Sequence, residues 1–463
     1  MSAHCCDHEA PKAEAIVNLP RYRKILWIAL IVNAAMFLIE IGAGLRRDPG
    51  VIALRNGSYA AGGYLGIANT AIRDSLPTRV ILTSADAVRA HSGYNEMSYN
   101  AFVVADATRL GMPRAMITSD GGTLDLAFTR GTESADGLAL RVLGDVNLAA
   151  AKDSEGYAGA VQVRGINEVV ASGAQASAGL DSASVDAGAL SALEAPRLIL
   201  NATLSSLYGK SGRYVTVNGE GSLTIRSGAA ISAADIILSG SKSMGSDGGK
   251  LTIEEGATLS TIGMGESSYD SGDGYIFSGL GVLALSNGWF NLLLQEENPN
   301  SPDGLYVDVG ACMTDACDRM TQLLSEGTIA LATNRALTIE NKVAYGTRRL
   351  VLGVSSVNLG ESAALAAAEA NGQLPDGLEL NQTRLAEILA GNSATHAPAV
   401  EVLELNATRA VNVYGAVDLD ASSLDQLVFG TPAIYGYGAD RDVATIRAGE
   451  FIWTGTDGEA GAP

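Results

Sequence analysis

A twelve-residue phrase occurs twice in this chain, and this repeat constrains the fold more than any other feature. Residues 221–232 read GSLTIRSGAAIS and residues 249–260 read GKLTIEEGATLS, so seven of twelve positions are identical at a spacing of 28 residues. In each copy the leucine and isoleucine of the L-T-I triplet point to one face of a strand and the threonine to the other. A single copy cannot bury its apolar face, whereas stacked copies bury it between them. The repeat therefore predicts a solenoid in which each copy is one corner of a coil.

This stacking predicts a register. Leu251 should lie over Leu223 and Ile253 over Ile225, in an aliphatic ladder inside a narrow tube. Residues 240–249, GSKSMGSDGG, should protrude as a loop, because the repeat spacing exceeds a minimal coil of roughly 20 residues. The aromatic content of 5% favours a narrow coil over an antiparallel sandwich or a propeller, which are the alternative all-β folds. The predicted fold is an all-β parallel β-helix with loop and short-helix insertions.

The strand pattern continues through most of the chain after residue 48. Apolar residues alternate there in short windows that are separated by Gly, Ser, Asn and Asp. Helical periodicity is clearest in residues 381–391, where Leu385, Ile388 and Leu389 share a face and Gly391 can end the helix. We expect residues 48–463 to form one β-helical domain.

The first 47 residues have a different composition. The chain has a formal net charge of −20, but residues 1–47 hold six Lys and Arg against four Asp and Glu. An acidic surface repels phosphate backbones, so nucleic acid is not an expected partner. Residues 25–45 form an apolar run that would make a helix about 31 Å long, which is enough to cross a bilayer. We expect a polar tail and one transmembrane-like helix over 1–47, and basic residues at both ends of the run leave its orientation open.

The polar tail contains a candidate metal site, with a metal-free tail as the alternative. His4, Cys5, Cys6 and His8 supply imidazole and thiol ligands of the kind that zinc and copper favour. The tail and apolar run together, residues 2–45, resemble the amino terminus and first transmembrane helix of bacterial cation diffusion facilitator transporters. The resemblance covers about one tenth of the chain and implies a membrane-anchored fragment of a cation-efflux transporter. The helices that carry transported zinc in that family have no counterpart here, since no second apolar run of this length follows.

A second resemblance covers most of the chain after residue 50. Residues 52–86, 227–241, 348–360 and 427–455 resemble large bacterial exoproteins of the filamentous haemagglutinin type. The resemblance implies a right-handed β-helical fibre that is secreted through an outer-membrane partner and adheres to glycans or proteins on host or bacterial cells. It implies that residues 48–463 are an internal piece of a longer protein. It also implies an extracellular or cell-surface location, while the apolar run would add an inner-membrane anchor. We expect an adhesin without catalytic activity.

A β-helical carbohydrate-active enzyme is the alternative that the acidic residues allow. Glycoside hydrolysis needs two carboxylates within about 5–10 Å of each other, and Asp303 and Asp308 are the pair to examine. We nevertheless expect no catalytic residues and no cofactor, because histidines are sparse and no G-x-S-x-G motif is present. Cys312 and Cys317 are expected to form a local disulfide in an oxidising compartment or to stay as free thiols, with a zinc or redox pair as the alternative.

Overall fold

The computed structural model divides the chain into two compact units, Met1–Met97 and Ser98–Pro463, called unit 1 and unit 2 below. The two units meet at residue 97 of the chain, whereas we predicted the domain boundary at the composition break near residue 47. The structure describes residues 24, 27–35, 51–76, 78–91, 97–110, 114–129, 136–152, 154, 156–180, 182–209, 212–241, 249–267, 275–278, 281–289, 291–294, 305–312, 318–340, 342–391 and 395–455.

Unit 1 contains a small antiparallel sheet and not the stacked coils expected from residue 48 onward. The strands β1 (Ile52–Ala53), β2 (Ser58–Gly63) and β3 (Thr78–Thr83) pair in this order, and the helix α2 (Ala85–His91) follows. Within the predicted apolar helix, residues 27–35 are helical, and residues 25–26 and 36–45 lie outside the described residues. None of the helices in the described part of the chain has the length and apolar character needed to span a bilayer.

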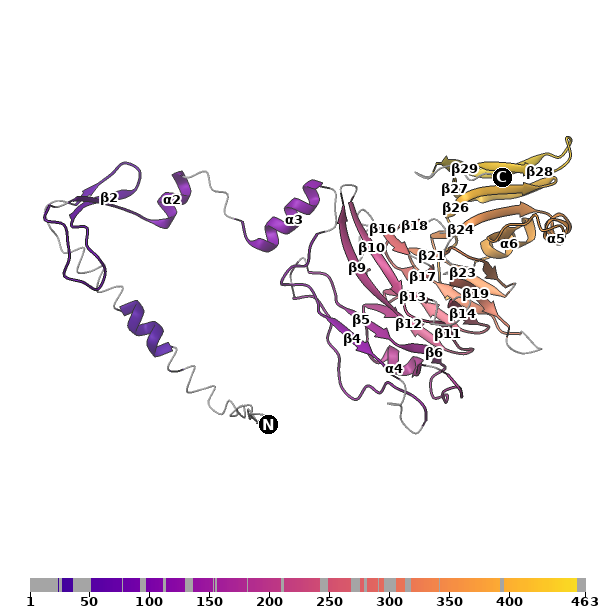
Figure 1. Ribbon diagram of the computed structural model, residues 1–463, viewed down its shortest axis with the longest axis horizontal. Coiled ribbons are helices and arrows are strands. Elements are labelled where there is room, and N and C mark those ends of the chain that lie inside the picture. The colour runs from indigo at the N-terminus through magenta and orange to yellow at the C-terminus, as the bar shows by residue number, and fades with distance from the viewer. Residues whose placement is uncertain are drawn as a thin grey trace, which may run out of the picture. The chain divides into compact units, whose positions relative to one another are not determined.

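Unit 2 is mostly β and is built from largely parallel sheets. Its longest sheet, called the first sheet, runs from one end of the unit to the other in Figure 1. Its strands, in chain order, are β4 (Thr123–Ala127), β5 (Ala160–Arg164), β8 (Arg197–Leu200), β13 (Asp235–Ser239), β17 (Gly281–Ser286), β21 (Thr328–Thr333), β24 (Arg349–Gly360), β25 (Leu378–Leu380), β26 (Val402–Tyr414), β27 (Val417–Gly430), β28 (Ile434–Tyr437) and β29 (Ala444–Thr454).

Two shorter sheets accompany it, and all their strand pairs are parallel. The second sheet contains β6 (Ile166–Val170), β7 (Ala183–Asp186), β11 (Leu223–Ile225), β14 (Gly249–Glu254), β19 (Leu305–Ala311) and β22 (Leu337–Ile339). The third sheet contains β12 (Ala230–Ser232), β15 (Thr258–Ser260), β20 (Thr321–Leu324) and β23 (Val343–Gly346).

The chain visits the three sheets repeatedly in the same order. It passes from β8 through β11 and β12 to β13, and from β13 through β14 and β15 to β17. The next two passages run from β17 through β19 and β20 to β21, and from β21 through β22 and β23 to β24. Each passage therefore places one strand on each sheet beside the strand from the previous passage.

The doubled phrase lies in the predicted register. Leu223 pairs with Leu251 and Ile225 with Ile253 between β11 and β14, and all four side chains are fully buried. The second halves of the two phrases also pair, Ile231 with Leu259, between β12 and β15. The predicted aliphatic ladder is confirmed. The loop predicted at residues 240–249 lies mostly outside the described residues.

Two longer ladders of apolar side chains run along the first sheet from β4 to β29. The registers of successive strands connect their members one by one, and most members have an exposed fraction of 2% or less. The first ladder is Leu124, Val161, Leu198, Ile236, Leu285, Ile329, Leu350, Leu403, Leu427 and Phe451, and the second is Leu126, Val163, Leu200, Leu238, Leu283, Leu331, Leu352, Leu405, Phe429 and Trp453.

Unit 2 departs from a uniform parallel stack at β17, which runs antiparallel to both β13 and β21. A fourth sheet branches off in the same region. It contains β9 (Ala202–Gly209), β10 (Gly212–Gly219), β16 (Tyr275–Ser278) and β18 (Asn291–Leu294). The four strands of this sheet lie in the chain between β8 and β19, so they interrupt the regular passage between the three main sheets.

Short helices are inserted between strands, as we expected. The predicted helix at 381–391 is confirmed as α6 (Gln382–Leu389), and the Asn381 side chain caps it by accepting from the Arg384 N–H. Leu385 and Ile388 are buried, and Gly391 follows the helix with a φ of 66°, a left-handed value that favours glycine. The other helices of this unit in the described ranges are α3 (Tyr99–Leu110), α4 (Ala187–Ser191) and α5 (Ser362–Ala370).

Candidate functional site

The candidate metal ligands His4, Cys5, Cys6 and His8 lie outside the described residues. Within the described part of the chain, no group of three or more His, Cys, Asp or Glu side chains could hold a metal ion. The metal site in the tail stays a prediction.

Asp308 lies on β19, and its proposed partner Asp303 lies outside the described residues. The Asp308 Oδ2 atom forms an ion pair with Lys250 Nζ at 3.2 Å, whereas Oδ1 is buried without a hydrogen-bond partner. Its neighbours in register on the adjacent strands are Thr252 and Thr338. The register therefore places hydroxyl groups, and not a second carboxylate, directly beside Asp308.

Cys312 follows β19 and is disulfide-bonded. Cys317 lies outside the described residues, so the pairing of these two cysteines stays a prediction.

The densest charged network described in unit 2 lies on the outer face of the second sheet. Arg226 joins two carboxylates there, with Nε at 2.6 Å from Glu168 and Nη1 at 2.7 Å from Glu254. The Glu168 side chain is fully buried and also accepts hydrogen bonds from the Ser177 N–H, the Ser177 hydroxyl and the Ser184 hydroxyl. This network holds the loop that carries Ser177 against the second sheet.

Hydrogen bonds in this network shift the pKa values of Glu168 and Arg226. Burial opposes ionisation of Glu168, but hydrogen bonds from Ser177, Arg226 and Ser184 outweigh burial and hold the pKa of this carboxyl below its usual value. Burial lowers the pKa of the Arg226 guanidinium, but its hydrogen bonds to Glu168 and Glu254 outweigh burial and raise this pKa overall. A general acid near neutral pH needs a raised carboxyl pKa, so Glu168 is suited to a structural role.

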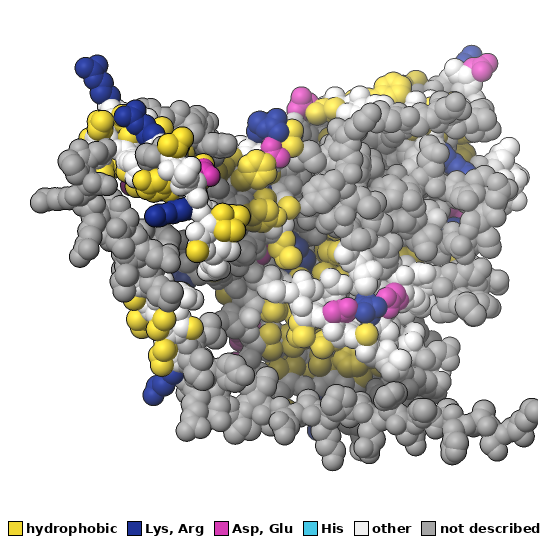
Figure 2. All heavy atoms as spheres, turned by 60° about the vertical axis from the view of Figure 1, so that its left-hand side comes forward, with side chains coloured by type: hydrophobic (Ala, Val, Ile, Leu, Met, Phe, Trp, Pro, Cys, Tyr) yellow, Lys and Arg dark blue, Asp and Glu magenta, His cyan; other side chains and the backbone are white. Residues whose placement is uncertain are grey.

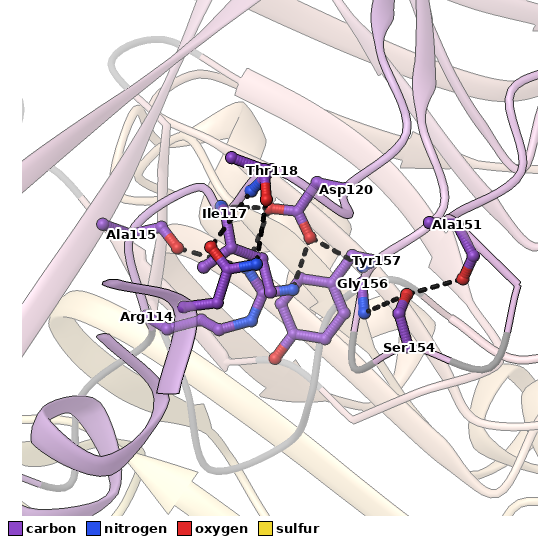
Figure 3. A network of polar contacts seen from close by, with 10 residues as sticks. Arg114, Ala115, Ile117, Thr118, Asp120, Ala151, Ser154, Gly156 and Tyr157 are labelled. Atoms are coloured by element: carbon purple, nitrogen blue, oxygen red, sulfur yellow. Dashed lines mark hydrogen bonds and ion pairs between the residues drawn. The ribbon is translucent and has the colours of Figure 1, made fainter. Parts of the chain in front are cut away.

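A second buried ion pair closes the β4 end of unit 2 (Figure 3). Arg114 donates to both carboxylate oxygens of Asp120, at 2.8 and 2.5 Å, and its guanidinium lies 3.9 Å from the centre of the Tyr157 ring. Asp120 also accepts from the backbone N–H groups of Ile117 and Tyr157. Burial disfavours the charged form of Asp120, but these hydrogen bonds lower its pKa overall. The two contacts with Tyr157 join residues 114–120 to the segment that precedes β5, so the network stabilises this end of the unit.

The opposite end of unit 2 has an open hollow beside β28. Its cavity volume is about 380 Å³, and its lining includes Tyr435, Tyr437, Asp440 and Asp442. The Tyr437 ring stacks on the buried Tyr414 ring with a centroid distance of 5.1 Å and an interplanar angle of 15°. Burial, followed by the influence of Tyr437, raises the pKa of Tyr414, so the Tyr414 hydroxyl stays neutral at physiological pH.

The hollow combines features that suit a polar ligand with an apolar face. Tyr437 keeps 37% of its surface exposed, and a Cβ atom built on Gly436 would meet no atom within 4 Å. Tyrosine faces pack against the C–H groups of flat ligands, while carboxylates and tyrosine hydroxyls form hydrogen bonds with polar groups. The sequence analysis did not predict this site. The signal that could have indicated it is the phrase YGYGADRD at 435–442, in which tyrosine and glycine alternate.

Charged side chains do not form a continuous field on the face drawn in Figure 2. Those drawn in colour there are isolated or lie in small groups of mixed sign. One such group in the described residues is Arg164 with Asp125 and Glu220, at 2.9 and 3.1 Å. Opposite charges within such a group partly cancel each other, while the chain as a whole keeps its formal net charge of −20.

The comparisons with known proteins give no relative for this chain. No family model, no curated protein and no solved structure matches it.

Proposed function

We propose that unit 2 is a right-handed parallel β-helical segment of a secreted, cell-surface filament that binds surface glycans or proteins and has no catalytic activity. The observation that carries the proposal is the pair of apolar ladders that extends from β4 to β29. The stacked apolar side chains fill the interior between the sheets. The side chains on the opposite face of each strand point outward and are left for binding. The right hand follows from the strong preference of parallel crossover connections.

Adhesion suits this architecture because many weak contacts can act together. A rod of stacked coils presents a similar outward-facing row of side chains at each coil. Several copies of the chain on one surface can therefore bind at the same time, and this avidity raises the effective affinity. The hollow at Tyr437, with a volume of about 380 Å³, is one recess in the described residues that could make such a contact. Its position on the outward side of β28 leaves it accessible to a ligand on another surface.

The proposal is tested by comparing single chains with chains displayed on beads. We expect weak binding of the free chain to cells and to glycan arrays, and much stronger binding when the chain is displayed many times on one bead. Replacing Gly436 with leucine fills the hollow and should weaken this binding. Gly144→Leu is the matched control, because a Cβ atom at Gly144 also meets no atom within 4 Å.

Two outcomes would contradict this function. Equal binding by free and displayed chains would remove the argument from avidity. Turnover of a polysaccharide that is lost in Asp308→Asn would instead favour the carbohydrate-active enzyme.

A further inference from the structure

The two apolar ladders of the first sheet are exposed where they reach β29. Leu427 and Phe429 on β27 are 2% and 1% exposed, whereas their register partners Phe451 and Trp453 are 46% and 54% exposed. In the described residues no strand pairs with the edge of β29 that faces away from β27. This edge offers unpaired backbone groups together with large apolar side chains, a combination that favours pairing with another strand.

The other end of the same ladders is covered. Leu124 and Leu126 on β4 are partly buried, and residues 139–148 pack against the same core through partly buried and buried apolar side chains. The Arg114 and Asp120 pair of Figure 3 holds the neighbouring backbone in place. A head-to-tail contact of β29 with this end is therefore obstructed, and a contact between two β29 edges is not.

The side-chain pattern of β29 changes at its middle. Ala444, Ile446 and Ala448 continue the interior rows of β27, and beyond the register shift the interior rows continue at Phe451 and Trp453. Interior positions are thus even-numbered in the first half of the strand and odd-numbered in the second. An antiparallel pair of identical strands keeps interior side chains together only if even positions face odd ones.

We propose that a second copy of this chain pairs its β29 with this β29, antiparallel, around a two-fold axis that passes close to Gly449. In this register Ile446 lies opposite Phe451 of the second copy, and Ala444 lies opposite Trp453 of the second copy. The interior side chains of both copies then face a common core on both halves of the strand. The contact is isologous, so it closes at two chains.

The charges of β29 complement each other in the same register. Arg447 lies opposite Glu450 of the second copy, and the symmetry repeats this pair. Within its own chain Arg447 already pairs with Asp418 at 2.7 Å, and Glu450 accepts a hydrogen bond from Gln426 at 2.7 Å. These partners lie on β27, on the side away from the free edge, so an ion pair between copies would be added to them across the edge. Arg447 and Glu450 are exposed, so this pair can form without burial of an unpaired charge.

Charge reversal tests the register with the full chain. Arg447→Glu and Glu450→Arg each place two like-charged pairs across the axis and should weaken dimerisation about tenfold, whereas the double variant should restore it. Asp418→Ala is the control, because it removes the pair that Arg447 forms within its own chain and leaves Arg447 in place. Analytical ultracentrifugation over a concentration series measures the dissociation constant, and hydrogen exchange of the amides of 444–454 should slow as the dimer forms.

Three results would overturn the proposal. The first is a monomer at every concentration. Protection of the β29 amides in such a monomer would mean that another part of the same chain pairs with the β29 edge. The second is an open-ended polymer, which requires a head-to-tail contact. The third is a dimer that neither charge reversal weakens.

Discussion

Replacing Ile253 with aspartate probes the stacked strands of the second sheet most directly. The Ile253 side chain is fully buried and pairs in register with Ile225 on one side and Val309 on the other. An aspartate at this position has no partner in either neighbouring strand, because both neighbouring side chains are aliphatic. The change therefore removes apolar contacts and buries an unpaired carboxyl group at the same time.

The expected loss of unfolding free energy follows from these two effects. Removing the buried isoleucine side chain costs about 2–5 kcal/mol, as in other substitutions of large core residues by small ones. An unpaired buried polar group adds about 1–3 kcal/mol, and more while it stays charged. The sum is a large fraction of the about 5–15 kcal/mol that stabilises an ordinary domain. We expect Ile253→Asp to be poorly soluble and readily digested by proteases.

Urea unfolding followed by circular dichroism, together with limited proteolysis, measures this loss. Ile253→Val should cost only about 0.5–1.5 kcal/mol, because it removes one methylene group from the same ladder. Ala230→Asp is the control for the added charge, since Ala230 is exposed on β12 and its neighbour Ile231 is buried. Wild-type stability of Ile253→Asp would refute the stacking of β11, β14 and β19 around an apolar interior.

Two further predictions concern acid stability and the division of the chain. Because the pKa of Glu168 lies below its usual value of 4.5, its stabilising effect is complete above that pH and is lost as the pH falls through the folded-state pKa. Glu168→Gln should therefore be less stable at neutral pH and should lose less stability on acidification, as measured by thermal melting between pH 3 and 7. A chain that begins at Ser98 should keep a β-type circular dichroism spectrum and melt cooperatively, because both long ladders lie within 124–453. A random-coil spectrum of that shortened chain would show that the two units depend on each other for folding.

The sequence by itself determined the local architecture of unit 2 where its residues repeat. The doubled phrase specified both strand identity and register, since a one-residue slip would move Leu251 and Ile253 from the interior to the outer face. The capped helix at Gln382–Leu389 was equally predictable, because its apolar spacing, its N-cap Asn381 and the following Gly391 are all local signals. The helix depends on residues that are neighbours in the sequence, and the strand register depends on the match between the two copies of the repeated phrase. Both signals are visible in a single sequence.

Only the tertiary structure decided how the remaining segments join this stack. Residues 52–83 have the alternating pattern of strands, yet they pair antiparallel with one another and lie in a separate unit, because a strand pattern does not specify its partner. The reversed direction of β17 has the same origin. The hollow at Tyr437 and the exposed edge of β29 likewise depend on which strands lack a neighbour, and pairing between distant segments, not local composition, sets that outcome.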